Sequence, residues 1–347
     1  MTEAGETREA LLHNEGNAAT GGIWRVRDAS GGSRILKVVK HGQAPTGSAW
    51  RTSDVPTHFN YWRRELLAYE TGFADAAFRD AGIRAPRLES LVTREDGSVE
   101  LWLEDVAGPS GFKFSIPRLR QFGHELGAGQ ARWAGRVPTA DEVPWLSRGW
   151  LRQYLSEGPG SNVRVRDEDW DDPVAQVWSA ATRAGLRRLW ERRMAALEQA
   201  ERLPRTLCHL DCWPANLLED SAGTSVLLDW AFVGEGALGE DPANLIIDSV
   251  TDGLMDAALL PEIAEAITTG YVEGLADGGW RGSADDVRRA IAMCAVAKYS
   301  WLGAHVIATA IRGRARKAAY DQDSAVDNLK RITGLAELLG DWAGGLD

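Results

Sequence analysis

Residues 206–230 read TLCHLDCWPANLLEDSAGTSVLLDW, and this stretch decides the fold. Its polar side chains recur at fixed distances: Asp211 is followed by four residues and then Asn216, and Asp229 follows a short apolar run. Two short strands joined by a turn would bring these three side chains to one end of a hairpin. The spacing therefore predicts that two carboxylates and an amide meet at one end of the hairpin.

The local structure expected around this hairpin follows from its prolines and glycine. Residues 205–209 are predicted to end an amphipathic helix, with Pro204 at the boundary. Residues 211–214 should form a tight loop, since Pro214 disfavours helical geometry at the residue before it. Gly223 would supply the turn between the two strands. Because loops are where reactive groups can face a ligand, the loop is the predicted reactive segment.

The pattern His209-x-Asp211, four residues, Asn216 and then Asp229-Trp230 resembles the aminoglycoside phosphotransferase family, which is related to choline kinases and protein kinases. This family has Asp-Trp where protein kinases have Asp-Phe-Gly. The resemblance implies that Asp211 accepts the proton of a substrate hydroxyl, while Asn216 and Asp229 hold Mg²⁺ against nucleotide phosphates. It also implies that His209 packs beneath the loop. The alternative is a hairpin that is merely polar at its ends.

The amino-terminal part has the lysine and carboxylate that such a site requires. Residues 17–22 (NAATGG) precede an alternating strand, and the next strand carries Lys37. Gly21 and Gly22 would let backbone N–H groups approach nucleotide phosphates, which Lys37 would also reach. Glu65, on a predicted helix with the sequence YWRRELLAYET, is the expected partner of Lys37. An ordinary turn is the alternative for the glycines, and a solvated acid is the alternative for Glu65.

Two further strands, the second ending in LWLEDVAG, resemble the segment that leads to the hinge of a kinase. Adenine would meet the backbone of about Glu104 to Val106. The resemblance thus implies an α+β, bilobal protein-kinase-like fold with a hinge at about 104–108. A small, mostly antiparallel β lobe would occupy residues 1–107, and a larger, mainly helical lobe residues 108–347.

The helical lobe is predicted from apolar spacing typical of helices, at residues 116–134, 174–202, 259–276, 284–310 and 324–342. Asp172 and Pro173 favour the start of a helix over a substrate-binding loop at 167–172. Further along, the family has an Asp followed four residues later by a second Asp; here Asp241 is followed by Leu245. Asp241 is therefore expected either to support the catalytic loop or to cap a helix.

Two other groups of residues are candidates for the substrate site. Asp248, Asp252 and Asp256 recur every four residues, a spacing that favours a solvated helix face over the wall of a cleft. Most of the fifteen tryptophans must be core residues. Trp213 is the candidate for stacking on a ring, because it lies inside the catalytic loop.

The composition excludes several classes of protein. A formal net charge of -11 argues against a nucleic-acid binder. No twenty-residue apolar span and no signal peptide are recognisable, so the chain is expected to be cytoplasmic, away from membranes. Its three cysteines are expected to be reduced and buried. The net charge is -3 in residues 1–110 and -8 beyond them. The acidic larger lobe favours a cationic acceptor, and the alternative is that its surface acids serve only solubility.

The expected function is transfer of the γ-phosphoryl group of ATP, with Mg²⁺, to a hydroxyl group of a small molecule. The first acceptor class is an aminoglycoside, nucleoside or similar antibiotic, which would make the chain a resistance enzyme. A metabolic kinase for a sugar, amino sugar or choline-like alcohol is the alternative. A catalytically inactive nucleotide-binding regulator is a third hypothesis, against which the joint presence of the lysine, carboxylates and amide argues. The sequence leaves ATP versus GTP, and the oligomeric state, open.

Overall fold

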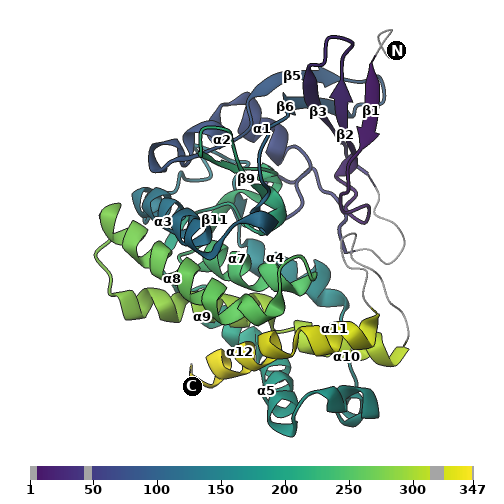
Figure 1. Cartoon of the computed structure of the whole chain (residues 1–347), viewed down its shortest axis with the longest axis vertical. Helices are drawn as coiled ribbons and strands as arrows, with labels where there is room; N and C mark the ends of the chain where they lie inside the picture. Colours follow the sequence, from purple (N-terminus) through teal and green to yellow (C-terminus); the bar gives the residue numbers. More distant parts are fainter. Residues whose placement is uncertain (1–5, 43–48, 313–323, 346–347) are drawn as a thin grey trace.

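The computed structural model describes residues 6–42, 49–312 and 324–345, and its amino-terminal part is built on an antiparallel five-stranded sheet (Figure 1). The strands lie in the order β1 (Thr7–Ala10), β2 (Thr20–Arg27), β3 (Ser33–Val39), β6 (Val99–Glu104) and β5 (Leu88–Thr93). The sequence did not predict β1, whose side chains are all exposed. Residues 1–5 of the polar amino terminus lie outside the described residues.

Alternation along β3 decides which side chains can reach the interior between sheet and helix. Leu36 and Val38 point to one face, where they pack with Trp102. Lys37 lies between them and so points to the opposite face, where α1 (Arg64–Glu70) lies. The period of two therefore places a lysine against a helix that carries a carboxylate.

Two small sheets join the amino-terminal part to the rest of the chain. Their strand orders are β4 (Ile83–Arg84), β10 (Ser225–Leu227), β9 (Leu217–Glu219) and β7 (Ser147–Arg148), β11 (Gly234–Ala237), β8 (Arg205–Cys208). The β9–β10 pair is the predicted hairpin. The prediction that residues 205–209 end a helix is wrong: they form β8, because they pair with β11 and bury Leu207 and Cys208 completely.

The carboxy-terminal part is mainly helical (Figure 1). Its helices are α3 (Ile116–Trp133), α4 (Trp150–Ser156), α5 (Ala180–Glu191), α6 (Arg193–Ala200), α7 (Glu240–Thr251), α8 (Leu260–Asp277), α9 (Ala284–Tyr299), α10 (Leu302–Arg312), α11 (Ala325–Arg331) and α12 (Thr333–Gly344), and the short α2 (Phe73–Ala76) lies in the amino-terminal part. α3 and α8 pack very closely, since a Cβ at Gly274 would lie 1.9 Å from the carbonyl oxygen of His124.

Three predicted helices are interrupted in the structure. The helix expected over residues 174–202 is a 3₁₀ turn (Pro173–Val177) followed by α5 and α6; Asp172 caps only that turn, and Ser179 caps α5. The helix expected over 284–310 breaks between α9 and α10, and the one over 324–342 breaks between α11 and α12. Apolar spacing alone does not reveal such interruptions.

The α9–α10 segment is also long and apolar enough to cross a membrane by length and composition. However, 89% of its most apolar window is buried inside the protein, as expected of a core helix. An antiparallel sheet followed by a helical part confirms the predicted α+β fold class. The three cysteines are free and buried, also as predicted.

Candidate active site

A cavity of about 820 Å³ is lined by side chains from both the sheet part and the helical part. It brings together most of the predicted site residues, namely Lys37, Glu65, Glu104, Val106, Asp211, Asn216 and Asp229. These residues come from β3, α1, the end of β6, the loop after β8 and the end of β10. The fold therefore assembles in one place residues that are up to about two hundred positions apart.

The two predicted phosphate-loop glycines lie inside β2 and not before it. In this region the cavity is lined by Thr20 and Ile23, and the pairing of β2 with β3 is irregular at Gly22. Gly22 has φ of +143°, and a Cβ there would lie 2.2 Å from the ring of Trp24. The strand itself therefore requires glycine at position 22, while Gly21 has an ordinary place in the same strand.

Lys37 lies between two carboxylates in the cavity wall. Its Nζ is 2.7 Å from Oε2 of Glu65 and 2.9 Å from Oδ1 of Asp229. Burial alone would lower the pKa of Lys37, but Asp229 and Glu65 outweigh burial and raise that pKa. The lysine is therefore a permanent cation, and the predicted Lys37–Glu65 pair is present.

Asp241 holds the loop that follows β8. Its fully buried carboxylate accepts hydrogen bonds from the backbone N–H groups of His209 (2.7 Å) and Leu210 (2.8 Å) and from Nε2 of Gln130 (2.7 Å). Leu210 has φ of 68°, a left-handed conformation that costs about 1–3 kcal/mol for a non-glycine residue and needs such support. Of the two roles expected for Asp241, loop support is therefore correct, since the N-cap residue of α7 is Gly239.

Asp211 follows this strained residue and lines the cavity. Nδ2 of Asn216 donates to both the backbone carbonyl and Oδ2 of Asp211, each at 2.9 Å. Both bonds use the amide nitrogen, so the amide oxygen of Asn216 remains to act as a ligand. Burial, together with the carboxylates of Asp229 and Asp248, raises the pKa of Asp211 to about 7. The carboxyl of Asp211 is thus easily protonated when no cation is bound near it.

Asp229 also has a left-handed backbone, with φ of 55°, and its side chain is 35% exposed. A short helix, η7 (Trp230–Phe232), follows it directly. Trp230 is fully buried, and its ring meets that of His209 edge-on at 5.1 Å. Burial lowers the pKa of His209 to about 4, so its imidazole is neutral. His209 therefore packs beneath the loop, as the family resemblance implied.

Glu104 and Asp105, at the end of β6, form ion pairs with arginine side chains. Arg84 donates to both oxygens of Glu104, at 2.9 and 3.1 Å. Arg25 and Ser33 donate to Asp105 at 2.7 and 2.5 Å. These carboxylates are engaged by side chains of the sheet region, which leaves the backbone around the lining residue Val106 as the part that could meet a ligand.

Aromatic and acidic side chains from the helical part line the rest of the cavity, including Trp150, Tyr154, Trp213, Asp248, Asp252 and Trp301. Burial and the carboxylates of Asp248, Asp211 and Asp252 all raise the pKa of Tyr154, so these acids lie close enough to act on its hydroxyl. The expectation of a solvated face is therefore wrong for Asp248 and Asp252, because α7 turns them toward the cavity. Asp256, by contrast, accepts a hydrogen bond from the backbone N–H of Ala258 outside it.

Sequence reasoning missed Lys298, which lines this wall, and the buried amide that holds it. Lys298 is 5% exposed, and its Nζ lies 4.9 Å from the ring centroid of Trp150. It donates to Oδ1 of Asn244, whose Nδ2 donates in turn to Asp248. The only available signals were a lone lysine within the apolar run AIAMCAVAKY, and the departure from the family pattern next to Asn244.

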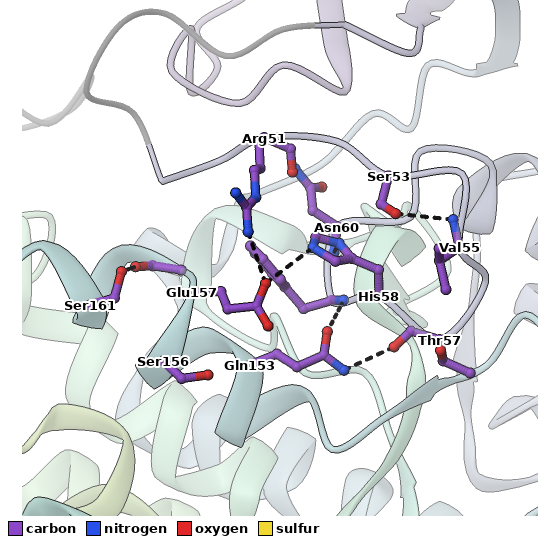
Figure 2. Close-up of polar contacts among 12 residues, drawn as sticks. Arg51, Ser53, Val55, Thr57, His58, Asn60, Gln153, Ser156, Glu157 and Ser161 are labelled. Carbon is purple, nitrogen blue, oxygen red and sulfur yellow. Dashed lines mark hydrogen bonds and ion pairs between the residues drawn. The ribbon is translucent and has the colours of Figure 1, made fainter.

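Figure 2 shows how the connection between β3 and α1 reaches the helical part. Gln153 of α4 accepts a hydrogen bond from the backbone N–H of Phe59 at 2.7 Å and donates to the carbonyl of Thr57 at 3.0 Å. Glu157, which follows α4, pairs with Arg51 at 3.0 Å. These contacts join the two parts of the molecule beside the cavity.

A two-part kinase-like fold with a paired lysine and clustered carboxylates in its central cavity defines a phosphotransferase. Residues 23–282 match the model of the phosphotransferase enzyme family, and the chain belongs to this family. A search of curated proteins finds no match.

Among solved structures, the chain is similar to an aminoglycoside phosphotransferase from Alicyclobacillus acidocaldarius subsp. acidocaldarius DSM 446, with 18% identity, a TM-score of 0.51 and coverage of 99% of this chain and 92% of that one. It is also similar to an ethanolamine kinase from Plasmodium vivax, with 11% identity, a TM-score of 0.50 and coverage of 97% and 84%. At these identities the likeness shows a shared fold.

Proposed function

We propose that the protein transfers the γ-phosphoryl group of ATP to a hydroxyl group of a small cationic acceptor, an aminoglycoside or a similar hydroxylated antibiotic. The observation that carries this proposal is the position of Asp211 in the same cavity as the Lys37–Asp229 pair. A proton acceptor and a phosphate-binding cation are the two groups that phosphoryl transfer needs close together.

The nucleotide would lie against the sheet part of the cavity. Lys37 would contact its phosphates, and its adenine would meet backbone groups from Glu104 to Val106. The oxygen of Asn216 and the carboxylate of Asp229 fit Mg²⁺, which binds hard oxygen ligands and keeps several waters. Mg²⁺ held there would neutralise charge on the phosphates. Titration of the protein with ATP and with GTP distinguishes which of the two nucleotides it uses.

Asp211 would orient the acceptor hydroxyl and take its proton as the new O–P bond forms. Asn216 holds this carboxylate through its amide nitrogen, so one side chain serves both the base and the metal. Catalysis would then rest on positioning and on neutralising charge, as in other phosphoryl transfers. His209 takes no part, because it is neutral and completely buried.

The acceptor would bind against the helical part of the cavity. Asp248 and Asp252 offer negative charge there, and the rings of Trp213 and Trp301 offer aromatic surface. An ammonium group gains energy from both, through ionic attraction and cation–π contact. This wall supports a cationic acceptor more directly than the net charge of the chain does.

The test is ATP consumption by the purified protein in the presence of Mg²⁺ and a panel of hydroxylated compounds. The panel contains aminoglycosides, nucleosides, macrolides, amino sugars, choline and neutral sugars, and mass spectrometry identifies any phosphate ester. We expect an ester with a cationic antibiotic and none with Asp211→Asn. An ester formed only with a metabolic alcohol would favour the metabolic kinase, and no ester with any compound would refute the proposal.

A further inference from the structure

Arg64, the residue before Glu65 in α1, is a completely buried cation. Within the described residues, its guanidinium donates five hydrogen bonds to the backbone carbonyls of Trp145 (2.8 Å), Phe59 (3.0 Å), Ala231 (3.0 Å), Pro56 (2.9 Å) and His58 (2.7 Å). Burial lowers the pKa of Arg64 to about 9. A buried charge solvated only by carbonyl groups is costly, so its retention calls for a reason beyond packing.

The five carbonyls belong to three segments that are far apart in the sequence. Three belong to residues 56–59, in the connection that leads into α1. Trp145 precedes β7 in the helical part, and Ala231 lies in η7, two residues after Asp229. A single side chain therefore joins α1, the connection before it and the loop that carries the proposed metal ligand.

Residues 56–59 are also bonded to α4 of the helical part (Figure 2). Arg64 takes the carbonyls of Pro56, His58 and Phe59, while Gln153 of α4 takes the carbonyl of Thr57. Gln153 also accepts the backbone N–H of Phe59. The peptide groups of residues 56–59 are thus bonded both to α1 of the amino-terminal part and to α4 of the helical part, so this segment connects the two parts.

The bond from Arg64 to Ala231 acts close to the strained residue Asp229. A left-handed aspartate is held only where the surrounding structure determines its backbone. Burial would raise the pKa of Asp229, but Lys37 and, to a smaller extent, the backbone N–H of Ala231 lower it. The hydrogen bond from Arg64 to the carbonyl of Ala231 therefore fixes the backbone two residues after Asp229.

We propose that Arg64 is a positioning residue that sets Asp229 in register with Lys37. Glu65 reaches Asp229 through the lysine, and Arg64 reaches it through the backbone of η7, so two neighbouring residues of α1 fix one metal-binding loop from two directions. The inference rests on the proposed function, because Asp229 matters in this way only if it binds the metal of a nucleotide complex.

Arg64→Lys is the informative variant, because it keeps the positive charge but lacks the planar fork that reaches five acceptors. An ammonium group has three donors, so at least two of the five carbonyls lose their partner. Arg63→Lys is the matched control: Arg63 is the preceding residue, is exposed and lies over the ring of Trp62. Both proteins carry the same total charge as the unchanged chain.

The measurement is a Mn²⁺ titration of each protein with a non-hydrolysable ATP analogue bound, followed by electron paramagnetic resonance of free Mn²⁺, with the unfolding temperature recorded separately. Loss of a residue that orients a metal ligand typically weakens metal affinity about 10- to 100-fold. We expect about tenfold weaker Mn²⁺ binding in Arg64→Lys and a change below about twofold in Arg63→Lys. A purely structural role would lower the unfolding temperature but leave the titration unchanged.

Weakening of less than about threefold in folded Arg64→Lys overturns the inference. If that variant does not fold, Gln153→Leu decides, because it removes the bonds between residues 56–59 and α4 and leaves Arg64 in place. Weaker Mn²⁺ binding in Gln153→Leu supports the inference, and unchanged binding overturns it. Failure of the unchanged protein to bind Mn²⁺ with the nucleotide analogue would instead count against the proposed function.

Discussion

Replacing Asp211 with Asn should stabilise the metal-free protein at neutral pH while abolishing most of its activity. The exchange is nearly isosteric, and the side-chain oxygen can still accept the hydrogen bond from Nδ2 of Asn216. What disappears is a negative charge that is buried beside Asp229 and Asp248. As the proposed proton acceptor, Asp211 should contribute about 10²- to 10⁴-fold to turnover, so the variant should lose activity by that factor.

The magnitude and its pH dependence follow from the pKa of Asp211, which rises from 3.8 to about 7 on folding. Between these values the folded protein holds a proton that the unfolded chain has released, so the contribution of Asp211 to stability falls as pH rises. A shift of about 3 pKa units at 1.36 kcal/mol each gives about 4 kcal/mol, an upper limit because the side chain is partly exposed. The stability advantage of the Asn variant should therefore grow from about pH 4 to pH 7 and level off above it.

The assay is urea unfolding of both proteins in chelator at pH 5, 6, 7 and 8, with turnover measured in parallel at pH 7.5. Titrating groups far from Asp211 are common to the two proteins and cancel in the difference between their free energies of unfolding, whereas Asp229 and Asp248 lose a negative neighbour, which adds to the advantage of the variant. A difference that stays constant from pH 5 to pH 8 would refute the reasoning. So would a variant that is less stable than the unchanged protein at pH 8.

Three further changes test other parts of the site. Asp229→Asn should lower Mg²⁺-dependent turnover at least about 100-fold, as measured by a Mg²⁺ titration, because a proposed metal ligand loses its charge; an unchanged Mg²⁺ dependence would exclude that role. Asp241→Asn should lower the free energy of unfolding by about 1–3 kcal/mol, because the amide nitrogen cannot accept the hydrogen bond that a backbone N–H group of the loop now donates to the carboxylate. Equal midpoints of urea unfolding for the variant and the unchanged protein would contradict this. Lys298→Met should lower kcat/KM for the acceptor about tenfold, because it leaves the buried Oδ1 of Asn244 without its donor and so loosens the hold of Asn244 on Asp248. KM for MgATP should change less than about twofold, and the exposed control Lys330→Met should change neither; a loss confined to MgATP would contradict the place of Lys298 in the acceptor wall.

The residues around the reacting groups could be predicted because each belongs to a short local pattern. Asp211 and Asn216 lie in one loop, and Asp229 follows the next strand at a recognisable spacing. Lys37 and Glu65 were predicted because a kinase-like site requires a lysine and a partner carboxylate, and the structure pairs them. In each case the chemistry constrains both the residue type and its distance along the chain, so the sequence carries the signal directly.

The remaining features depend on contacts between distant residues, which leave no local pattern. Lys298 meets Asn244 across 54 positions, and neither residue type is unusual where it stands. The four-residue spacing of Asp248 and Asp252 indicates that they share a helix face, but it does not indicate that this face lines the cavity. The strand β8 looked like the end of a helix because its pairing with β11 is also long-range.

The departure from the family pattern after Asp241 separates the two halves of the site. Leu245, where a second Asp is expected, is completely buried, and Asp241 supports the catalytic loop with a donor from Gln130 of α3. The neighbouring Asn244 instead points its amide at Lys298, where a carboxylate would have formed an ion pair. The departure at position 245 therefore leaves the loop of the proposed base supported, while Asn244 beside it is held by Lys298 and in turn holds Asp248 of the acceptor wall.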